Sequence, residues 1–517
     1  MPENSTPENT VVPGNAEVVI SGAGPNGLML AAELALAGVR PIVLERLPEP
    51  SDEPKANGMV GQIVRFLDQR GLYEEISGRA GPPQPAPAFF FGGMTMSFAE
   101  VVDNPLHLLP VPQPKLVRLL DKRALDLGVE IRRSHELTGL VQDESGVTLT
   151  VSGPRGEYEL RTRFLVGADG GKSLVRKQTG IAFPGVTDTK GVTRLAQVSL
   201  PGLQRTADGG IDIPGVGPLG FGFNRLERGT FVFAELQPGK TLIATGELRT
   251  GPIPDGTPLT LDELRDSVRR VLGVDLGFGP PEGPGPHPLR RITTQNTRQA
   301  ENYRAGNVFL IGDAAHVHSG MGGPGLNLGM QDVANLGWKL AAYLRGHAPE
   351  SLLDTYQSER HPVGERVMMH SLAQAALIAP GPEVTALRRL FGEMVRKQEN
   401  SAFIAHLMAG SDVRYDIGDT HPLSGRMVPD LAVGSRRVTE LLRTARPVLA
   451  DFTGGTEIGA AAVGWADRVD LVSESTSDTP VAAVLVRPDG YVAWATDSPQ
   501  ETDGLQEALT RWFGAAA

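Results

Sequence analysis

The alternation of apolar and polar positions near the N-terminus predicts a strand, a helix and a second strand. An apolar run at Val18 to Ile20 leads into a glycine cluster, an Ala- and Leu-rich stretch continues to Gly38, and a second apolar run spans Pro41 to Leu44. Short apolar runs bounded by glycines are typical of buried strands, and the stretch between them has the length of a helix. The sequence therefore predicts a βαβ unit that opens an α/β, Rossmann-like domain.

The next part of the chain reads as one domain interrupted by a β-rich insertion. The segment from Pro184 to Pro288 contains short β-like runs, many glycines and one helical pattern at 261–272. After it, an apolar strand at 307–311 leads through a glycine loop into a helix that extends to about Arg345, so the first domain resumes. Further helices are predicted at 62–77 and 116–127, and further strands at 129–131, 146–151, 157–166, 231–235 and 241–247.

The C-terminal end has strand signals of its own, at 482–486 and 491–495. Between them, Arg487-Pro488-Asp489-Gly490 has the composition of a tight turn. The predicted organisation is a disordered tail over 1–15, a discontinuous dinucleotide-binding domain over 16–183 and 289–400, an inserted β-sheet domain over 184–288 and a C-terminal domain over 421–517.

Composition and charge narrow the possible functions. Of 517 residues, 49 are Lys or Arg and 60 are Asp or Glu, and the net charge of −11 disfavours nucleic acid and anionic membranes as partners. The absence of cysteine excludes disulfides, thiolate metal sites and dithiol chemistry, so a redox reaction would require a bound cofactor. Residues 1–15 lack the features of a signal peptide, and no apolar stretch has the length of a membrane helix. We expect a cytoplasmic protein, a monomer or homodimer, without a metal site.

The first glycine cluster has the spacing of a dinucleotide-binding turn. Gly22-Ala23-Gly24-Pro25-Asn26-Gly27 fits G-x-G-x-x-G, follows a predicted strand and opens a predicted helix. Its amides and the helix N-terminus can hold a pyrophosphate, and Glu45 at the end of the second strand can accept hydrogen bonds from an adenosine ribose. The alternative is a tight structural turn with a surface glutamate.

Two later motifs follow predicted strands in the same way. Asp169-Gly170 comes after 164–167, and by itself it could be an ordinary helix start with Ser173 exposed. Gly312-Asp313-Ala314-Ala315-His316 is followed by Gly322-Gly323-Pro324-Gly325-Leu326-Asn327. A carboxylate there can bind a polyol chain, and glycines allow backbone amides to approach a ring system. The alternative is a glycine-rich connector.

Together these motifs closely resemble those of the group A flavoprotein aromatic monooxygenases, the family of para-hydroxybenzoate hydroxylase and phenol hydroxylase, and especially the aromatic-polyketide hydroxylases. The resemblance covers about residues 16 to 400 and includes Val111-Pro112-Gln113 and Glu359-Arg360-His361-Pro362. It continues in His421-Pro422-Leu423-Ser424-Gly425 and in Arg487 to Tyr491, which look like the thioredoxin-like C-terminal domain of these enzymes. Without cysteines, that domain is expected to be structural or an interface.

The resemblance implies a set of cofactor-binding residues. Gly22, Gly24 and Gly27, with Pro25 and Asn26, would bind the FAD pyrophosphate, and Glu45 with Arg46 would lie at the adenosine ribose. Gln113 and Lys55 would lie along the flavin, Asp313 would hold the ribityl or pyrophosphate region, and the loop from Gly322, Gly323, Gly325 and Leu326 to Asn327 would approach the isoalloxazine. Asp169 would serve both FAD and NAD(P)H.

This chain departs from the family pattern at several of these positions. The family often has Arg where Lys55 and Gln62 stand, Pro-Pro where Ser319-Gly320 stands, and Gln where Pro324 stands. Lys keeps the positive charge of Arg but loses its planar fork. The seating of the flavin is therefore the least defined part of the prediction.

The function implied by the resemblance is FAD-dependent oxygenation. NADPH or NADH would act as a transient co-substrate, and O2 would add to the reduced flavin as a C4a-peroxide that hydroxylates a polycyclic aromatic, polyketide-type substrate in natural-product biosynthesis. Baeyer–Villiger oxygenation on the same scaffold, or a non-catalytic flavin- or polyketide-binding protein, remain alternatives. No Trp-x-Trp-x-Ile-Pro stretch of a flavin halogenase is present.

The sequence identifies no catalytic acid or base. His316 and His318 lie beside the glycine loop, where a structural hydrogen bond is the commoner role. In the inserted domain, which the resemblance assigns to substrate binding, Phe221, Phe223, Phe231 and Phe233 could line an aromatic pocket or equally form sheet core, and Phe89 to Phe91 with Met94 carry the same ambiguity.

Overall fold

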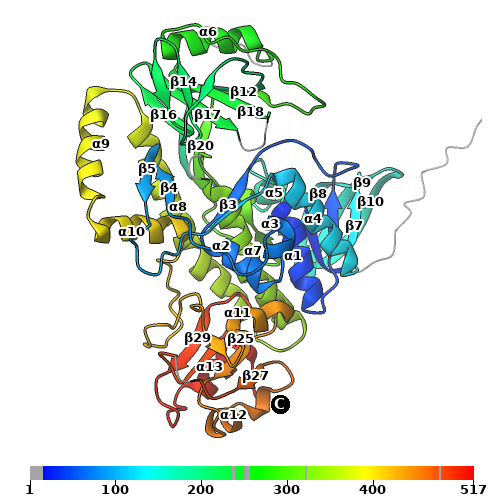
Figure 1. Ribbon diagram of the computed structural model, residues 1–517. Helices are drawn as coiled ribbons and strands as arrows, with labels where there is room; N and C mark the ends of the chain where they lie inside the picture. The colour runs from blue at the N-terminus through cyan, green and yellow to red at the C-terminus, as the bar shows by residue number, and fades with distance from the viewer. Residues whose placement is uncertain (1–15, 236–238, 250, 252–256, 321–322, 477–478) are drawn as a thin grey trace, which may run out of the picture.

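The computed structural model describes residues 16–235, 239–249, 251, 257–320, 323–476 and 479–517, so the predicted tail over 1–15 lies outside the described residues. Figure 1 shows three units in a row, with a β-rich unit at the top, an α/β unit in the middle and a small C-terminal unit at the bottom. Two long helices, α7 (Pro324–Leu344) and α8 (Ser351–Ile378), run through the middle of the molecule.

The middle unit is built on an eight-stranded sheet in the order β21-β22-β10-β1-β2-β7, with the β8–β9 hairpin attached to β10. The pairs that join β22, β10, β1, β2 and β7 are parallel, which confirms the predicted α/β arrangement. Its strands are β1 (Ala16–Ser21), β2 (Ile42–Glu45), β7 (Glu130–Arg133), β8 (Glu136–Asp143), β9 (Gly146–Gly153), β10 (Gly156–Gly167), β21 (Arg304–Ala305) and β22 (Val308–Leu310).

Helices cover this sheet and complete its core. α1 (Pro25–Leu36) packs between α4 (Gln113–Asp126) and α7, and Leu28, Met29 and Leu30 are completely buried. The predicted helix over 62–77 is two helices, α2 (Gln62–Gln69) and α3 (Tyr73–Ser77), because Gly71 between them has a left-handed φ of 68°. α5 (Leu174–Gln178) follows β10.

Three helices that the sequence did not predict extend the middle unit toward the top. α8 is followed by α9 (Pro382–Met394) and α10 (Gln398–Ala409), so the predicted boundary at residue 400 falls inside α10. The hairpin of β4 (Ala88–Phe91) and β5 (Met94–Ser97) packs on the end of α8, where Arg388 donates to the carbonyls of Gly92 (2.5 Å) and Leu377 (2.8 Å). A further pair is β3 (Gly58–Val60) with β6 (Leu108–Pro110).

The upper unit is an antiparallel sheet in the order β16-β17-β18-β12-β19, with α6 (Leu261–Leu272) against it. Because β19 pairs with β12, this sheet extends beyond residue 288, where the predicted insertion ended. Its strands are β12 (Gly191–Val198), β16 (Gly222–Leu226), β17 (Gly229–Glu235), β18 (Thr241–Leu248) and β19 (Leu289–Ile292). Two small sheets adjoin it, formed by β13 (Gln204–Arg205), β14 (Ile211–Ile213) and β15 (Gly217–Leu219), and by β11 (Gly185–Asp188), β20 (Gln295–Gln299) and β23 (His316–Val317).

The C-terminal unit is a four-stranded mixed sheet in the order β27-β26-β28-β29. Its elements are β24 (Ala432–Val433), β25 (Arg436–Arg437), α11 (Val438–Leu441), β26 (Val448–Asp451), α12 (Glu457–Ala461), β27 (Asp470–Ser473), β28 (Ala483–Val486), β29 (Val492–Thr496) and α13 (Leu505–Phe513). The turn between β28 and β29 faces α7 and α8, and a shared core of Trp338 and Leu352 with Leu485 and Trp512 joins this unit to the middle one.

Candidate FAD-binding site

The three glycine-bearing turns meet at one edge of the sheet. They follow the neighbouring parallel strands β1, β10 and β22 at their carboxyl ends, since Gly167 lies opposite both Ser21 and Leu310. The turns also touch each other, because Arg176 after the second turn donates to the carbonyl of Ala314 in the third (2.7 Å). Ligands of open α/β sheets bind at this position.

The first turn is closed on its protein side and open on the other. A Cβ at Gly22 would lie 2.6 Å from the carbonyl oxygen of Ala168, and a Cβ at Gly27 would overlap the carbonyl of Gly22. At Gly24, by contrast, a Cβ would meet no atom within 4 Å, and Gly24 is the N-cap of α1 without a side-chain cap. The helix N-terminus therefore faces space that a phosphate group can occupy.

Asn26 connects the first turn to the third. Its amide group lies against Gly312 and Gly329, where any Cβ would overlap it. Its Oδ1 is buried and accepts no hydrogen bond from the described residues. Pro25, at the first position of α1, fixes the entry of the helix.

The carboxylate of Glu45 closes the other side of the first turn. It accepts hydrogen bonds from the amides of Ala23 (2.8 Å) and Leu47 (2.9 Å) and stays half-buried at the end of β2. Each carboxylate oxygen keeps capacity for a further donor. Arg46 beside it is exposed.

The second turn supports α5 and leaves one oxygen free. Asp169 Oδ2 accepts from the amides of Leu174 (2.7 Å) and Val175 (3.2 Å), and Ser173, which is buried, caps the helix by accepting from Arg176 N (3.0 Å). The helix-start interpretation expected Ser173 to be exposed, and the structure shows that it is buried. Asp169 Oδ1 is buried without a partner among the described residues, so the structural role of this motif leaves a ligand contact open.

The third turn presents Asp313 outward. Asp313 is exposed in a short 3-10 turn, η1 (Gly312–Ala314), and its Oδ1 lies 4.0 Å from a Cβ placed on Gly325 at the start of α7. Gly323 is the N-cap of α7 with φ 67° and open space around it. Leu326 is half-buried, and the predicted contact Gly322 lies outside the described residues.

Asn327 works as a clamp within the protein. Its Oδ1 accepts from Val60 N (2.8 Å) and its Nδ2 donates to the carbonyl of Gly323 (2.7 Å), so this buried amide joins β3 to the glycine loop. We therefore expect the backbone that Asn327 holds, and not its side chain, to approach the flavin ring.

The two positions expected along the flavin differ in rigidity. Gln113 accepts from Ala56 N with its Oε1 (3.2 Å) and donates its backbone amide to Ala56 O (2.9 Å), which fixes the segment that precedes β3. Lys55 is more than half exposed and pairs with Glu53 at 3.4 Å, so its charge is held by the protein only loosely.

A cavity of about 550 Å³ lies beside the second and third turns. Gly171 and Lys172 line one side, and His318 to Gly320 line the other. Phe183, Ile292 and Arg298 complete part of its wall. His318 donates its Nδ1–H to Ser319 O (2.9 Å), and burial lowers the pKa of His318, so its ring is neutral.

Below the turns lies a group of buried charges that the sequence analysis missed. His316, completely buried, donates Nε2–H to Asp332 on α7 (2.6 Å), and Asp332 pairs with Arg360 on α8 (3.0 Å). Of this group the sequence analysis named His316, for which a structural hydrogen bond was the commoner role, whereas the resemblance at Glu359 to Pro362 gave Arg360 no role and Asp332 was not noticed.

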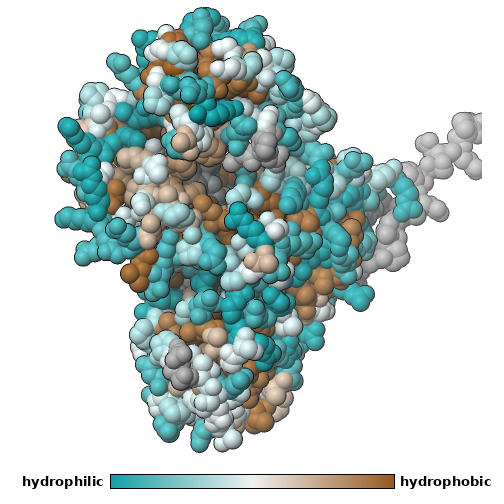
Figure 2. All heavy atoms as spheres, in the orientation of Figure 1, coloured by the Kyte–Doolittle hydropathy of each residue, from teal (hydrophilic) through white to brown (hydrophobic). Residues whose placement is uncertain are grey.

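The candidate substrate phenylalanines separate into two sets. Phe231 and Phe233 are buried in the core cluster that includes residues of α6, which agrees with the sheet-core interpretation. Phe221 and Phe223 are half-buried, and Phe223 faces the β4–β5 hairpin, where Phe89, Phe90 and Met94 are also half-buried and Phe91 is core. Figure 2 shows weakly hydrophobic surface over this hairpin, below the upper unit.

Comparison with known proteins identifies the family. The family described as FAD binding domain matches residues 15–216 and 226–371, and that described as aromatic-ring hydroxylase, C-terminal, matches 421–516. The chain belongs to the FAD-dependent aromatic-ring monooxygenases.

Full-length relatives agree with this assignment. The chain is 41% identical over 516 residues to the 12-dehydrotetracycline 5-monooxygenase/anhydrotetracycline 6-monooxygenase of Streptomyces rimosus, covering 97% of this chain and 99% of the relative. The solved anhydrotetracycline hydroxylase from S. rimosus superposes with a TM-score of 0.85 at 39% identity, covering 98% and 100% of the two chains. A dialkyldecalin synthase of Streptomyces rugosporus is 36% identical over 508 residues, covering 97% and 99%.

The described residues form neither a membrane-spanning helix nor a cluster of metal ligands. None of their helices is both long and apolar enough to cross a bilayer, and they contain no group of three or more His, Cys, Asp or Glu side chains arranged to hold a metal ion.

Proposed function

We propose that the protein binds FAD in the cradle of the three turns, accepts electrons from NADPH or NADH, and inserts one oxygen atom from O2 into a polycyclic aromatic substrate of polyketide type. The observation that carries the proposal is the open, uncapped N-terminus of α1 at Gly24, beside Glu45 and joined through Asn26 to the turn that bears Asp313, in a chain of this family. Bound FAD would supply the electron transfer and the activation of oxygen.

Different residues of the three turns would bind different parts of FAD. The amides at the start of α1 would bind the pyrophosphate, and the Glu45 carboxylate would accept the ribose hydroxyls beside Arg46. Asp313, which has no partner among the described residues, would bind the ribityl side, and the unpaired Oδ1 of Asp169 would complete that wall. Gln113 and Asn327 would fix the two segments between which the ring lies.

The N-terminal end of α7 would stabilise negative charge on the bound flavin. Its N-cap, Gly323, has no side chain to satisfy the first amides, so the positive end of the helix dipole is available to an anion. An anionic reduced cofactor near Gly325 would be stabilised by about 0.3–1 kcal/mol, or up to about 2 kcal/mol when partly buried.

The cavity beside Lys172 suits the transient nicotinamide nucleotide. Lys172 is exposed and has no ion pair within the described part of the chain, so it can meet a pyrophosphate. The aromatic substrate would lie toward the β4–β5 hairpin, where the half-buried Phe90, Phe223 and Met94 offer apolar area. Hydroxylation of an activated phenol then requires positioning and exclusion of water.

We also infer a thioredoxin-like fold for the C-terminal unit. Its sheet order β27-β26-β28-β29, with β26 parallel to β27 and antiparallel to β28, supports this, as does the α12 crossover between β26 and β27. Because the chain has no cysteine, the unit serves structure and not redox chemistry.

The test is oxygenation by the purified protein. After incubation with FAD it should be yellow, and anhydrotetracycline or related polycyclic phenols should accelerate NADPH oxidation and yield a product carrying one atom of isotopically labelled O2. A protein that stays colourless with excess FAD contradicts the proposal. Ring hydroxylation and Baeyer–Villiger insertion both add a single oxygen, so the product mass is the same and the product structure distinguishes them.

The dialkyldecalin synthase relative favours a second candidate, a non-oxygenating enzyme or binder on the same scaffold. It would bind FAD yet show no substrate-stimulated NADPH oxidation and no incorporation of label. These two readouts therefore decide between the candidates.

A further inference from the structure

Asp332 fixes both ends of the flavin-facing turn. Its Oδ2 accepts a hydrogen bond from Gly312 N (3.1 Å) at the start of the turn and from His316 Nε2 (2.6 Å) at its end. Asp313, the expected flavin ligand, lies between these two anchors. Since Asp332 is completely buried on α7, the helix that begins at the glycine loop, it holds the two flavin-facing segments in one geometry.

Arg360 compensates the charge of Asp332 and extends the contact away from the turn. Its Nε donates to Asp332 Oδ1 (3.0 Å), its Nη2 donates to Leu328 O (3.3 Å), and its Nη1 donates to Tyr415 Oη (3.1 Å). A buried carboxylate is tolerated when it is paired and hydrogen-bonded. The place of the Arg360 guanidinium is therefore set by Asp332 on one side and by Tyr415 on the other.

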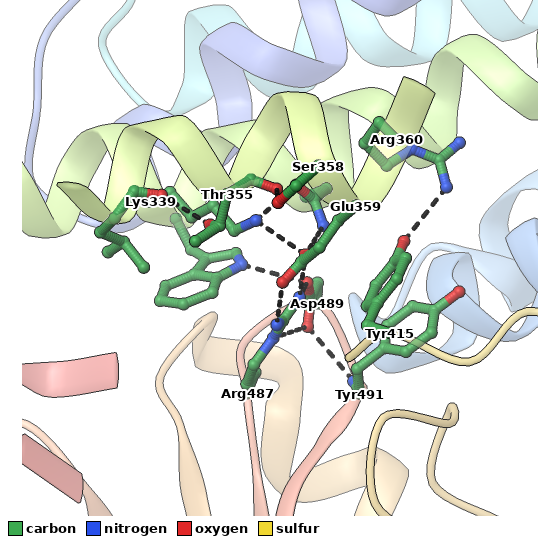
Figure 3. A network of polar contacts seen from close by, with 12 residues as sticks. Lys339, Thr355, Ser358, Glu359, Arg360, Tyr415, Arg487, Asp489 and Tyr491 are labelled. Carbon is green, nitrogen blue, oxygen red and sulfur yellow. Dashed lines mark hydrogen bonds and ion pairs between the residues drawn. The ribbon is translucent and has the colours of Figure 1, made fainter. Parts of the chain in front are cut away.

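Tyr415 lies in the segment between α10 and the C-terminal unit, and the C-terminal unit holds it, since Tyr415 N donates to Gly425 O (2.8 Å). Its ring stacks on Tyr491 with centroids 4.3 Å apart, and Tyr491 N donates to Asp489 Oδ1 (3.2 Å). Arg487 of the same turn donates to both oxygens of Glu359, at 2.7 and 2.8 Å. Figure 3 shows Arg487 reaching Glu359 of α8 from the turn below, with Asp489 beside Arg487, while Arg360 reaches Tyr415.

We propose that Asp332 and Arg360 are positioning residues for the flavin-facing turn, and that docking of the C-terminal unit sets the turn through Tyr415. This rests on the proposed FAD site, which it extends to residues that touch no cofactor. The path from Tyr491 to Gly312 consists of packed or hydrogen-bonded groups without a solvent gap, so a shift at one end displaces the other.

The first variant, Tyr415→Phe, removes only the hydroxyl that Arg360 contacts. We expect the chain to fold, while the Kd for FAD rises about three- to tenfold, the range for one hydrogen bond. The visible spectrum of bound flavin should shift, and KM for the aromatic substrate should stay unchanged. Asp332→Asn, which removes the central charge, should weaken FAD more strongly than Tyr415→Phe.

Arg437→Gln is the matched control. Arg437 of β25 pairs with Asp68 of α2 at 2.8 Å, so it joins the same two units but lies off the path to Gly312. It should lower the unfolding temperature and leave the FAD Kd within about twofold and the flavin spectrum unchanged, because an exposed or partly exposed ion pair acts locally.

The outcomes separate this inference from the proposed function. A parent protein that binds no FAD overturns both. A parent that binds FAD, with Tyr415→Phe binding it equally well, overturns only the inference, as does Arg437→Gln weakening FAD as much as Tyr415→Phe. If Asp332→Asn does not fold, the comparison of Tyr415→Phe with Arg437→Gln decides.

Discussion

Individual glycines of the first turn serve different purposes, and the structure separates them. Gly22 and Gly27 allow the backbone to close on itself, because a side chain at either position would overlap a carbonyl group. Gly24 faces open space, so the protein alone does not require glycine there. We therefore expect the bound ligand, and not the protein, to require glycine at Gly24.

Gly24→Val should therefore abolish FAD retention without loss of folding. The valine would occupy the space proposed for a phosphate, and its Cβ would meet no protein atom within 4 Å. Gly27→Ala is the contrasting variant and should reduce the yield of folded protein. Gel filtration with absorbance at protein and flavin bands, together with circular dichroism, checks both; a yellow Gly24→Val protein would remove this turn from the site.

Asp313 and Asn327 should show the same contrast as Gly24 and Gly27: substitution of Asp313 should affect FAD binding, and substitution of Asn327 should affect stability. Asp313→Ala loses no hydrogen bond within the described protein, so FAD should bind more weakly at unchanged stability. Asn327→Ala leaves Val60 N–H buried and unpaired, which should cost about 1–3 kcal/mol of unfolding free energy. Urea titrations of the apoprotein and FAD titrations measure the two effects, and a destabilised Asp313→Ala would show a structural role for that carboxylate.

The sequence predicted where the turns lie but not how each side chain is used. Glycine spacing after a strand is a local signal, so Gly22 to Gly27, Asp169 and Asp313 could be found. The partner of Asn327 is 267 positions away, and that of Gln113 is 57 positions away. Pairings over such separations exist only in the folded chain.

At the level of elements, α8 shows why some helices escaped prediction. Its buried positions include Glu359, Arg360, His370, Ser371 and Gln374, and Pro362 lies inside it. Periodicity finds helices by a stripe of apolar residues, and in this helix buried polar residues interrupt that stripe. α6, with an apolar stripe and Thr260 as its cap, was predicted with its observed bounds.

The buried polar groups of α8 predict acid sensitivity. Burial lowers the pKa of His370 to about 4, so the folded state keeps it neutral while the unfolded chain takes up a proton below about pH 6.5. Its contribution is present above pH 6.5 and is lost as the pH falls toward 4. His107, with a pKa lowered to about 4 by burial, acts in the same direction.

We expect the free energy of unfolding to fall between pH 6.5 and 4, by at most about 3 kcal/mol for each of these groups. His370→Gln should flatten part of this slope. Urea unfolding at a series of pH values measures it. An unchanged slope in His370→Gln would show that the pKa of His370 is not lowered in the folded protein.

At the level of the whole molecule, a compact charge cluster joins the C-terminal unit to the two long helices. Burial opposes the charge on Glu359, but Arg487 and Lys339 outweigh it and lower the pKa of Glu359 to about 2. Burial lowers the pKa of Lys339 to about 8 despite Glu359. The cluster is stable as a set, and each member depends on the others.

Arg487→Met should therefore destabilise the protein by about 3–5 kcal/mol, since it leaves Glu359 and Asp489 without their shared cation. The C-terminal unit should detach first. Thermal unfolding and limited proteolysis between residues 410 and 421 check this, with Arg446→Met, whose ion pair to Asp470 lies within the C-terminal unit and is partly exposed, as the control. Equal effects of the two substitutions would contradict a special role for the cluster.

The shared core beneath that cluster has a practical consequence for anyone who shortens the chain. A fragment ending after α10 would expose the apolar side chains of Trp338 and Leu352 to solvent, beside a Glu359 that keeps Lys339 but has lost Arg487. Such a fragment would aggregate on expression, although it would still contain all three glycine-bearing turns.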